Sequence, residues 1–308
     1  MFQLLIGTDI PFMKYRKFAY AFSGLVLALT LGWFFTKGPK YSVDFTGGTL
    51  LQVRLDKPVH ADELRKALEG AGLAAEIQQL TGESNDEYLL RFRTEGDPVT
   101  VVQEAVAKGM PGVTLEMRRN ETVGPKVGAD LRRKALWAVL ASLGAILLYV
   151  GFRYEFKFAV GGVLALFHDV VVTVGALMFT GREISLTVIA ALLTIAGYSI
   201  NDTIVVFDRI RERSSALRKE KHDRVMDLAV NETLSRTIIT AFTVFLASLA
   251  LFVWGGEVLR DFSFAMLVGV VFGTYSSVYV ASAIALDIWL SVDRNQAAAA
   301  AAAKTSKS

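Results

Sequence analysis

The chain has 308 residues, of which 53% are hydrophobic and only 20% are charged, and its mean hydropathy is +0.41. Soluble domains carry about 25% charged residues, so this composition excludes an ordinary soluble globule, a disordered chain and a collagen-like repeat. The absence of cysteine excludes disulfides, thiol catalysis and cysteine-based metal sites, and 3 isolated histidines do not favour a histidine metal centre. The sequence therefore predicts an integral membrane protein with no metal and no cofactor.

The first apolar run covers residues 18–36 and is preceded by the basic residues Lys14, Arg16 and Lys17. It is long enough to cross about 30 Å of hydrocarbon. It ends at Trp33 and Lys37, an interfacial aromatic and a cation, which is typical of a retained helix and not of a cleaved signal peptide.

Five further apolar runs predict transmembrane helices within residues 135–290. They cover 135–152, 156–180, 184–207, 234–254 and 262–290. The last run is longer than one span needs, so we expect it to tilt or to extend along the interface. The fold class predicted here is a polytopic α-helical membrane protein with six transmembrane helices.

Lysine and arginine are concentrated in segments that an N-in, C-in topology places in the cytoplasm. These are the N-terminus 1–17 and the basic segment 208–224, whereas the short outside loops hold only Arg182 and Arg260. The basic run 132–134 disagrees, but long translocated domains largely escape this rule. The basic excess is thus interpreted as a topology signal and not as a nucleic-acid site. The tail 291–308, with its alanines at 297–303, is also expected in the cytoplasm and carries no predicted function.

Residues 37–134 alternate apolar and polar positions and predict a separate external α+β domain. Expected strands cover 41–55, interrupted at Gly47-Gly48, then 74–80, 87–93 and 113–119. One expected helix covers 60–70, and a second begins at Asp97-Pro98, with the aspartate as N-cap and the proline as first helical residue. The order βαββαβ predicts a ferredoxin-like domain.

Charged residues inside the apolar runs are the candidate functional residues. Asp169 lies near the middle of the third span, beside His168, and Asp261 lies at the outer entrance of the sixth. Asp202 lies about five residues from the inner end of the fourth span, or roughly 8 Å into the membrane at 1.5 Å per residue. Arg236 lies at a comparable depth in the fifth span, so an ion pair with Asp202 is reasonable. An ionised group at a helix centre costs about 2.5–3.5 kcal/mol and usually serves a purpose there.

Each candidate also has a structural interpretation. Asp202 and Arg236 could form a static ion pair that only fixes helix packing, and Asp169 with His168 could be a satisfied buried pair. Asp261 could belong to an ordinary wetted loop. Gly269 and Gly273 have the spacing of a helix-contact motif. No nucleotide-binding loop or catalytic triad is present, so the chemistry supports a proton-linked transport or mechanical device that is not an enzyme.

Several stretches of the chain carry distinctive motifs. One is 43–49, with Asp44, Gly47 and Gly48, and a second is 123–128. The most distinctive is 197–212, with Gly197, Asn201, Asp208 and Arg209. Two shorter stretches are 232–237 and 261–263. Together these stretches resemble the signatures of SecF subunits in the SecD/SecF family of bacterial protein-export membrane proteins, and the resemblance extends from about residue 14 to 290.

This resemblance implies a subunit that pairs with SecD and the SecYEG channel and acts on exported unfolded polypeptide in the bacterial inner membrane. It also implies use of the proton-motive force. RND transporters, which the family resembles, consist of two six-helix halves, and this chain would correspond to one such half. On this basis Asp202 is the leading proton carrier, Arg236 its charge partner, Asp261 an aid to proton entry and Asp169 a lesser candidate. The alternatives are half of an RND-type small-molecule or lipid transporter, and a scaffold subunit that transduces nothing.

Overall fold

The computed structural model describes residues 7–80, 86–92 and 98–305. The chain divides into two compact units. One combines Met1–Lys40 with Ala138–Ser308, and the other is Tyr41–Trp137. The first unit contains most of the membrane-crossing helices and the second contains the four-stranded sheet.

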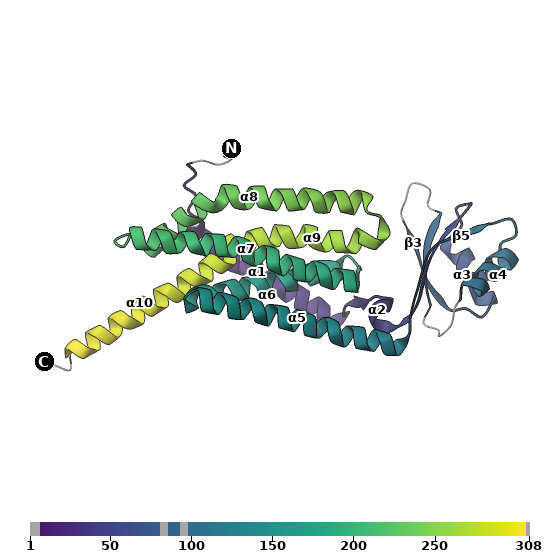
Figure 1. Cartoon of the computed structure of the whole chain (residues 1–308), viewed down its shortest axis with the longest axis horizontal. Helices are drawn as coiled ribbons and strands as arrows, with labels where there is room; N and C mark the ends of the chain where they lie inside the picture. Colours follow the sequence, from purple (N-terminus) through teal and green to yellow (C-terminus); the bar gives the residue numbers. More distant parts are fainter. Residues whose placement is uncertain (1–6, 81–85, 93–97, 306–308) are drawn as a thin grey trace. The chain divides into compact units, whose positions relative to one another are not determined.

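Six helical segments are long and apolar enough to cross a membrane, which confirms the predicted fold class. Four of them are single helices. The first joins the short helix η1 to α1, and the sixth joins α9 and α10 through a π-helical turn, η2. The long helices are labelled in Figure 1. The bounds are α1 (Arg16–Thr36), α5 (Pro125–Arg153), α6 (Phe156–Phe179), α7 (Leu186–Ala216), α8 (His222–Trp254), α9 (Gly256–Ser276), η2 (Ser277–Ala281) and α10 (Ser282–Thr305).

Three helices extend well beyond the apolar runs that predicted them. α5 begins at Pro125 and not near residue 135, and α8 begins at His222 and not near residue 234. α7 continues to Ala216, so most of the basic segment 208–224 is helical and not loop. Hydrophobicity marks only the part of a helix that crosses the hydrocarbon, whereas backbone hydrogen bonding continues through good helix formers such as Arg, Glu and Lys.

Helix α6 is central to the membrane unit and packs against α1, α7, α9 and α10. Its partners approach closely because α9 presents glycines to α7. A Cβ at Gly269 would lie 2.3 Å from Ile195 Cδ1, and one at Gly273 would lie 3.2 Å from Ser199 Cβ. The glycine spacing therefore does serve helix contact, as its structural interpretation proposed.

The N-terminal segment is held against the ends of the bundle helices. Phe12 and Met13, in the short helix η1 (Phe12–Tyr15), are 5% and 1% exposed. The side-chain amide of Asn231 accepts from Ile10 N and donates to Ile10 O, and Asp227 Oδ1 accepts from Met13 N at 2.8 Å. These contacts make the segment a packed part of the first unit.

The second unit is a ferredoxin-like βαββαβ domain, as predicted. Its elements are β2 (Gly48–Leu55), α3 (Ala61–Gly70), β3 (Ala75–Leu80), β4 (Glu87–Phe92), α4 (Val99–Gly109) and β5 (Leu115–Val123). The strands pair antiparallel in the order β3-β4-β2-β5. Helices α3 and α4 cover one face of the sheet (Figure 1), and alternate residues of β2 and β4 point into the core beneath them.

Two local predictions in this domain were wrong. Residues 41–55 are not one interrupted strand, because Lys40–Tyr41 (β1) is followed by a helical turn, α2 (Val43–Thr46), before β2 begins. Ser42 caps that turn by accepting from Asp44 N, a local side-chain bond that competes with strand pairing. Pro98 is the N-cap of α4 and not its first helical residue, and Asp97 lies outside the described residues. Among the residues that the structure describes, the remaining short strand is β6 (Glu183–Ile184).

The two glycine-containing stretches before and after this domain's sheet contact each other. Gly47 has φ 72°, in the left-handed region, and a Cβ there would lie 2.8 Å from Pro125 Cα. A Cβ at Gly128 would lie 3.0 Å from Gly47 N and 3.3 Å from Asp44 O. The start of β2 and the start of α5 thus meet backbone to backbone, which only glycine permits.

We therefore expect Gly128→Ala to destabilise the second unit by about 1–3 kcal/mol through overpacking. The matched control is Gly124→Ala, because a Cβ at Gly124 meets no atom within 4 Å and should change stability by less than about 0.5 kcal/mol. Pulse proteolysis of the full chain in denaturant measures both. Equal stability of the two variants would contradict the close contact.

Candidate functional site

Asp202 lies on α7, and its side chain is directed into the helix bundle. It is 3% exposed, and its Oδ2 atom makes no hydrogen bond within the described part of the chain. Tyr198, one turn earlier, likewise has a buried hydroxyl without a partner there. An unsatisfied buried polar group costs about 1–3 kcal/mol, so two of them one turn apart indicate a functional position or bound water.

Arg236 acts on Asp202 through its charge but does not form the expected ion pair. Tyr198, Thr240 and Arg236 are close enough to interact electrostatically with Asp202. Within the described ranges, no ion pair within 4.0 Å joins the two, and the Arg236 side chain is exposed on the surface of the unit. The helix rotation that places Thr237 inside the bundle turns Arg236 outward, which hydropathy could not reveal.

Asp261 lies in an ion pair that sequence analysis missed. Arg182, just after α6, donates to Asp261 Oδ1 at 2.5 Å, and its guanidinium lies 4.5 Å from the ring centroid of Phe264. The backbone N–H of Glu183 donates to the other carboxylate oxygen. The pair joins the loop between α6 and α7 to α9, so Asp261 does not lie in an isolated wetted loop.

Asp169 lies at the meeting point of three helices and is fully buried. His168 Nδ1 lies 2.9 Å from Asp169 Oδ1, while Ser199 of α7 and Ser276 of α9 donate to Oδ2 at 2.5 and 2.6 Å. The two serines were not predicted. Their only sequence signal is their occurrence as small polar residues inside apolar runs.

The other signature residues fall into two groups. Asp208 accepts from the Tyr154 hydroxyl at 3.0 Å, and burial together with this bond raises the pKa of Tyr154 to about 12. Arg209 donates to Glu232 of α8 at 2.6 Å, so it ties the inner ends of α7 and α8 together. By contrast, Gly197 and Asn201 are exposed on α7.

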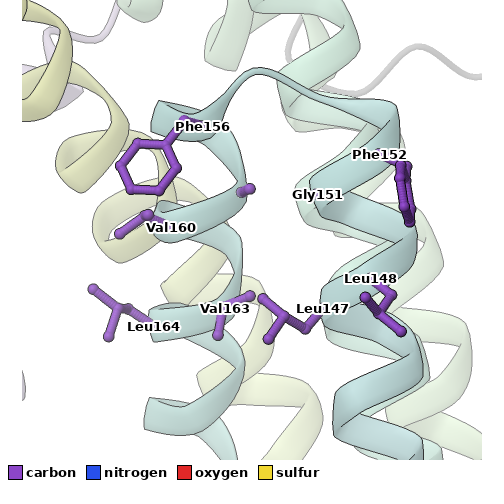
Figure 2. A pocket seen from close by; sticks show the side chains of 9 residues that line it. Leu147, Leu148, Gly151, Phe152, Phe156, Val160, Val163 and Leu164 are labelled. Carbon is purple, nitrogen blue, oxygen red and sulfur yellow. The ribbon is translucent and has the colours of Figure 1, made fainter.

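An apolar groove of about 440 Å³ lies between the last turns of α5 and the first turns of α6. Figure 2 shows the side chains of Leu147 on α5 and Val163 on α6 directed toward each other between the two helices. Its walls carry no ionisable or nucleophilic side chain, so the groove does not supply chemistry. No group of His, Asp and Glu residues able to hold a metal occurs among the residues that the structure describes.

The helix bundle thus holds the buried carboxylates of Asp169 and Asp202, and Asp202 has a tyrosine and an arginine nearby. The fold and these groups define a multi-pass α-helical membrane protein with a separate α/β domain and ionisable side chains inside its helix bundle.

Comparisons with known proteins agree with this class. Residues 102–291 match the family "Protein export membrane protein SecD/SecF, C-terminal", and residues 32–59 match the SecD/SecF GG motif. The protein translocase subunit SecF of Vibrio alginolyticus is 43% identical over 94% of this chain and 93% of its own length. That of Pseudomonas aeruginosa is 42% identical over 93% of both chains. The chain therefore belongs to the SecD/SecF family, among its SecF members.

A solved structure of SecDF from Thermus thermophilus, described as a translocon-associated membrane protein, has the same fold. It is 41% identical with a TM-score of 0.85 over 94% of this chain. A SecDF structure in a super-membrane-facing form is also 41% identical, with a TM-score of 0.72. This chain spans about two fifths of these SecDF chains, 40% and 41% respectively.

Proposed function

We propose that this chain is a subunit of the Sec protein-export machinery that works with SecD and uses the proton-motive force to promote translocation of unfolded polypeptide. The observation that carries the proposal is the buried Asp202 carboxylate with its unpartnered Oδ2 atom, in a chain that belongs to the SecF family. A carboxylate in this position can take up a proton and lose it again, and each state changes the charge inside the bundle.

In this mechanism Asp202 carries the proton and Arg236 responds to its charge. When Asp202 is ionised, its field attracts the exposed guanidinium of Arg236, and protonation removes that attraction. Asp261 assists proton entry when its bond to Arg182 opens, and Asp169 is a lesser candidate for the path. Two arrangements of α7 and α8 would then alternate with the proton, and the external domain would follow the helices to which it is joined.

A SecD-type partner is supported by an exposed stripe on α7. Ala190, Thr194, Gly197 and Asn201 recur at helical spacing and are all exposed, although small and polar residues gain little from contact with lipid tails. Such a stripe permits close approach of a second helix. The match covers only 40% of the Thermus SecDF chain, so that protein holds further chain beyond the part that this chain resembles.

The test is co-purification from detergent. Gly197→Leu should lose a SecD-like chain, because its side chain would occupy the stripe at a position where a Cβ meets no atom of this chain within 4 Å. Gly24→Leu on α1 is the matched control, since a Cβ there also meets nothing, and it should retain the partner. The proposed interface is contradicted if a SecD-like chain co-purifies with Gly197→Leu, or if it co-purifies with neither Gly197→Leu nor the Gly24→Leu control. Retention of a small-molecule substrate instead would favour the RND-type transporter.

We further propose that both termini are cytoplasmic and that the α/β domain is external, in the bacterial inner membrane. The chain has no cysteine, so a single introduced thiol reports one position. Ala71→Cys, at the exposed end of α3, should be labelled by an impermeant reagent in intact cells. Ser215→Cys, at the exposed end of α7, should react only after permeabilisation, and the reverse pattern would invert the topology.

A further inference from the structure

The pair His168–Asp169 contains an atom that the packing leaves unsatisfied. His168 is 2% exposed and Asp169 is 0% exposed, near the middle of α6. The ring nitrogen Nδ1 contacts the carboxylate, but the second ring nitrogen, Nε2, is buried and has no hydrogen-bond partner within the described residues. Neutral imidazole presents one donor and one acceptor nitrogen, and imidazolium presents two donors.

The hydrogen bonds around Asp169 determine which nitrogen can exchange a proton. Ser199 and Ser276 both donate to Oδ2, so Oδ1 is the oxygen that remains for His168. A carboxylate that accepts on both oxygens orients the imidazole with its Nδ1–H toward Oδ1, as carboxylates do for histidines elsewhere. The exchangeable position of the pair is then Nε2.

We propose that His168 and Asp169 form a second proton-exchanging site, separate from Asp202, in which His168 Nε2 takes up and releases the proton and water carries it. Uptake places a proton from hydronium on the Nε2 lone pair and leaves water, and the pair changes from net charge −1 to neutral. Release returns that proton to water. The bond between Nδ1 and Oδ1 persists in both states, so Asp169 is the positioning residue.

The helices packed against α6 carry the other titratable groups around the pair. Within the described residues, the ion pair that involves His168 and Asp169 is the one between them. Arg16 of α1 forms an ion pair with Asp287 of α10, at 3.1 Å. The other titratable groups on these elements include Tyr20 on α1, Tyr198 and Asp202 on α7, Tyr275 on α9, Tyr279 on η2 and Asp287 on α10.

The serines connect this site to the helices that surround it. Ser199 lies three residues before Asp202 on α7, and Ser276 directly precedes the π-helical turn η2. π-helical turns frequently occur at functional sites. When His168 takes up the proton, Asp169 stays ionised, but the new positive charge on the imidazolium draws on its carboxylate. The bonds from both serines to Oδ2 then weaken, because the carboxylate becomes a poorer acceptor. The protonation state of the pair can therefore change the position of the α7 turn that carries Asp202. This link to Asp202 rests on the proposed function.

Nitrogen-15 NMR of histidine-labelled full chain in lipid bilayers tests the site directly, because the chain has only 3 histidines. His60 and His222 are assigned from their Asn variants. Across a pH titration, His168 Nδ1 should remain protonated while Nε2 loses its proton as the pH rises. Ser276→Ala should move the midpoint of this change to higher pH, because the Asp169 carboxylate loses a donor and then attracts the imidazolium more strongly.

An Nε2 that stays protonated, or stays unprotonated, throughout the titration would overturn the proposal and leave a static buried pair, and so would an unprotonated Nδ1. A Ser276→Ala midpoint equal to that of the unmodified chain would also contradict it. The NMR result does not depend on protein export. If His168 titrates as expected while Asp202→Asn exports normally, the second site stands and the proposed function fails.

Discussion

Replacement of Asp202 by asparagine should abolish the part of protein export that depends on the proton gradient. The amide has nearly the same shape but cannot bind and release a proton. One elementary charge crossing 100 mV carries about 2.3 kcal/mol, which corresponds to a shift of about 50-fold in a two-state equilibrium. The measurement is export of a reporter protein by membrane vesicles with and without an imposed gradient.

The same vesicles should contain normal amounts of the variant and of its SecD-like partner. Asp223→Asn, at the exposed start of α8, makes the same chemical change in a side chain that is 50% exposed, and it should export normally. Arg236→Ala should reproduce the loss, and the double variant should be no worse than either single one if the two residues act as a unit. Normal gradient-dependent export by Asp202→Asn would show that the carboxylate is structural.

Truncation of Leu90 to alanine should be among the most damaging changes to the α/β domain. Leu90 lies on β4 with no exposed surface, in the cluster formed with Leu51 and Leu64. Loss of its side chain should lower the free energy of unfolding of this domain by about 2–5 kcal/mol, through lost burial and the cavity that remains. Hydrogen exchange of the amides of β2 and β4 in the full chain measures the change.

Leu89 provides a control of the same residue type one position earlier. Successive side chains of a strand point to opposite faces, and Leu89 is only partly buried on the face that α3 and α4 do not cover. Leu89→Ala should therefore destabilise the domain much less than Leu90→Ala. If the two variants exchanged equally fast, the assigned register of β4 would be wrong.

The local predictions that failed show what a sequence pattern measures. The expected strand over 41–55 is divided because Ser42 bonds to the backbone of Asp44 and Gly47 adopts a left-handed conformation. A pattern of alternating apolar residues contains no information about such a side-chain hydrogen bond. In the same way, the apolar windows located the centres of α5 and α8 but not their polar ends.

The sequence by itself determined the six membrane-crossing helices, the order of elements in the α/β domain and the SecF signatures. These depend on local properties, namely the transfer free energy of about 20 consecutive residues and the period of apolar positions. It also singled out Asp202 and Asp169, because a carboxylate inside an apolar run is visible without knowledge of its neighbours.

Only the tertiary structure decided which side chains meet. It pairs Asp261 with Arg182. It places Ser199 and Ser276 against Asp169. It also turns the Arg236 side chain outward. The physical reason is that the hydropathy of a helix does not depend on its rotation about its own axis or on which helices lie beside it. The rotation and the neighbours are determined by close packing, such as the approach of α9 to α7 at Gly273, which joins residues far apart in the chain.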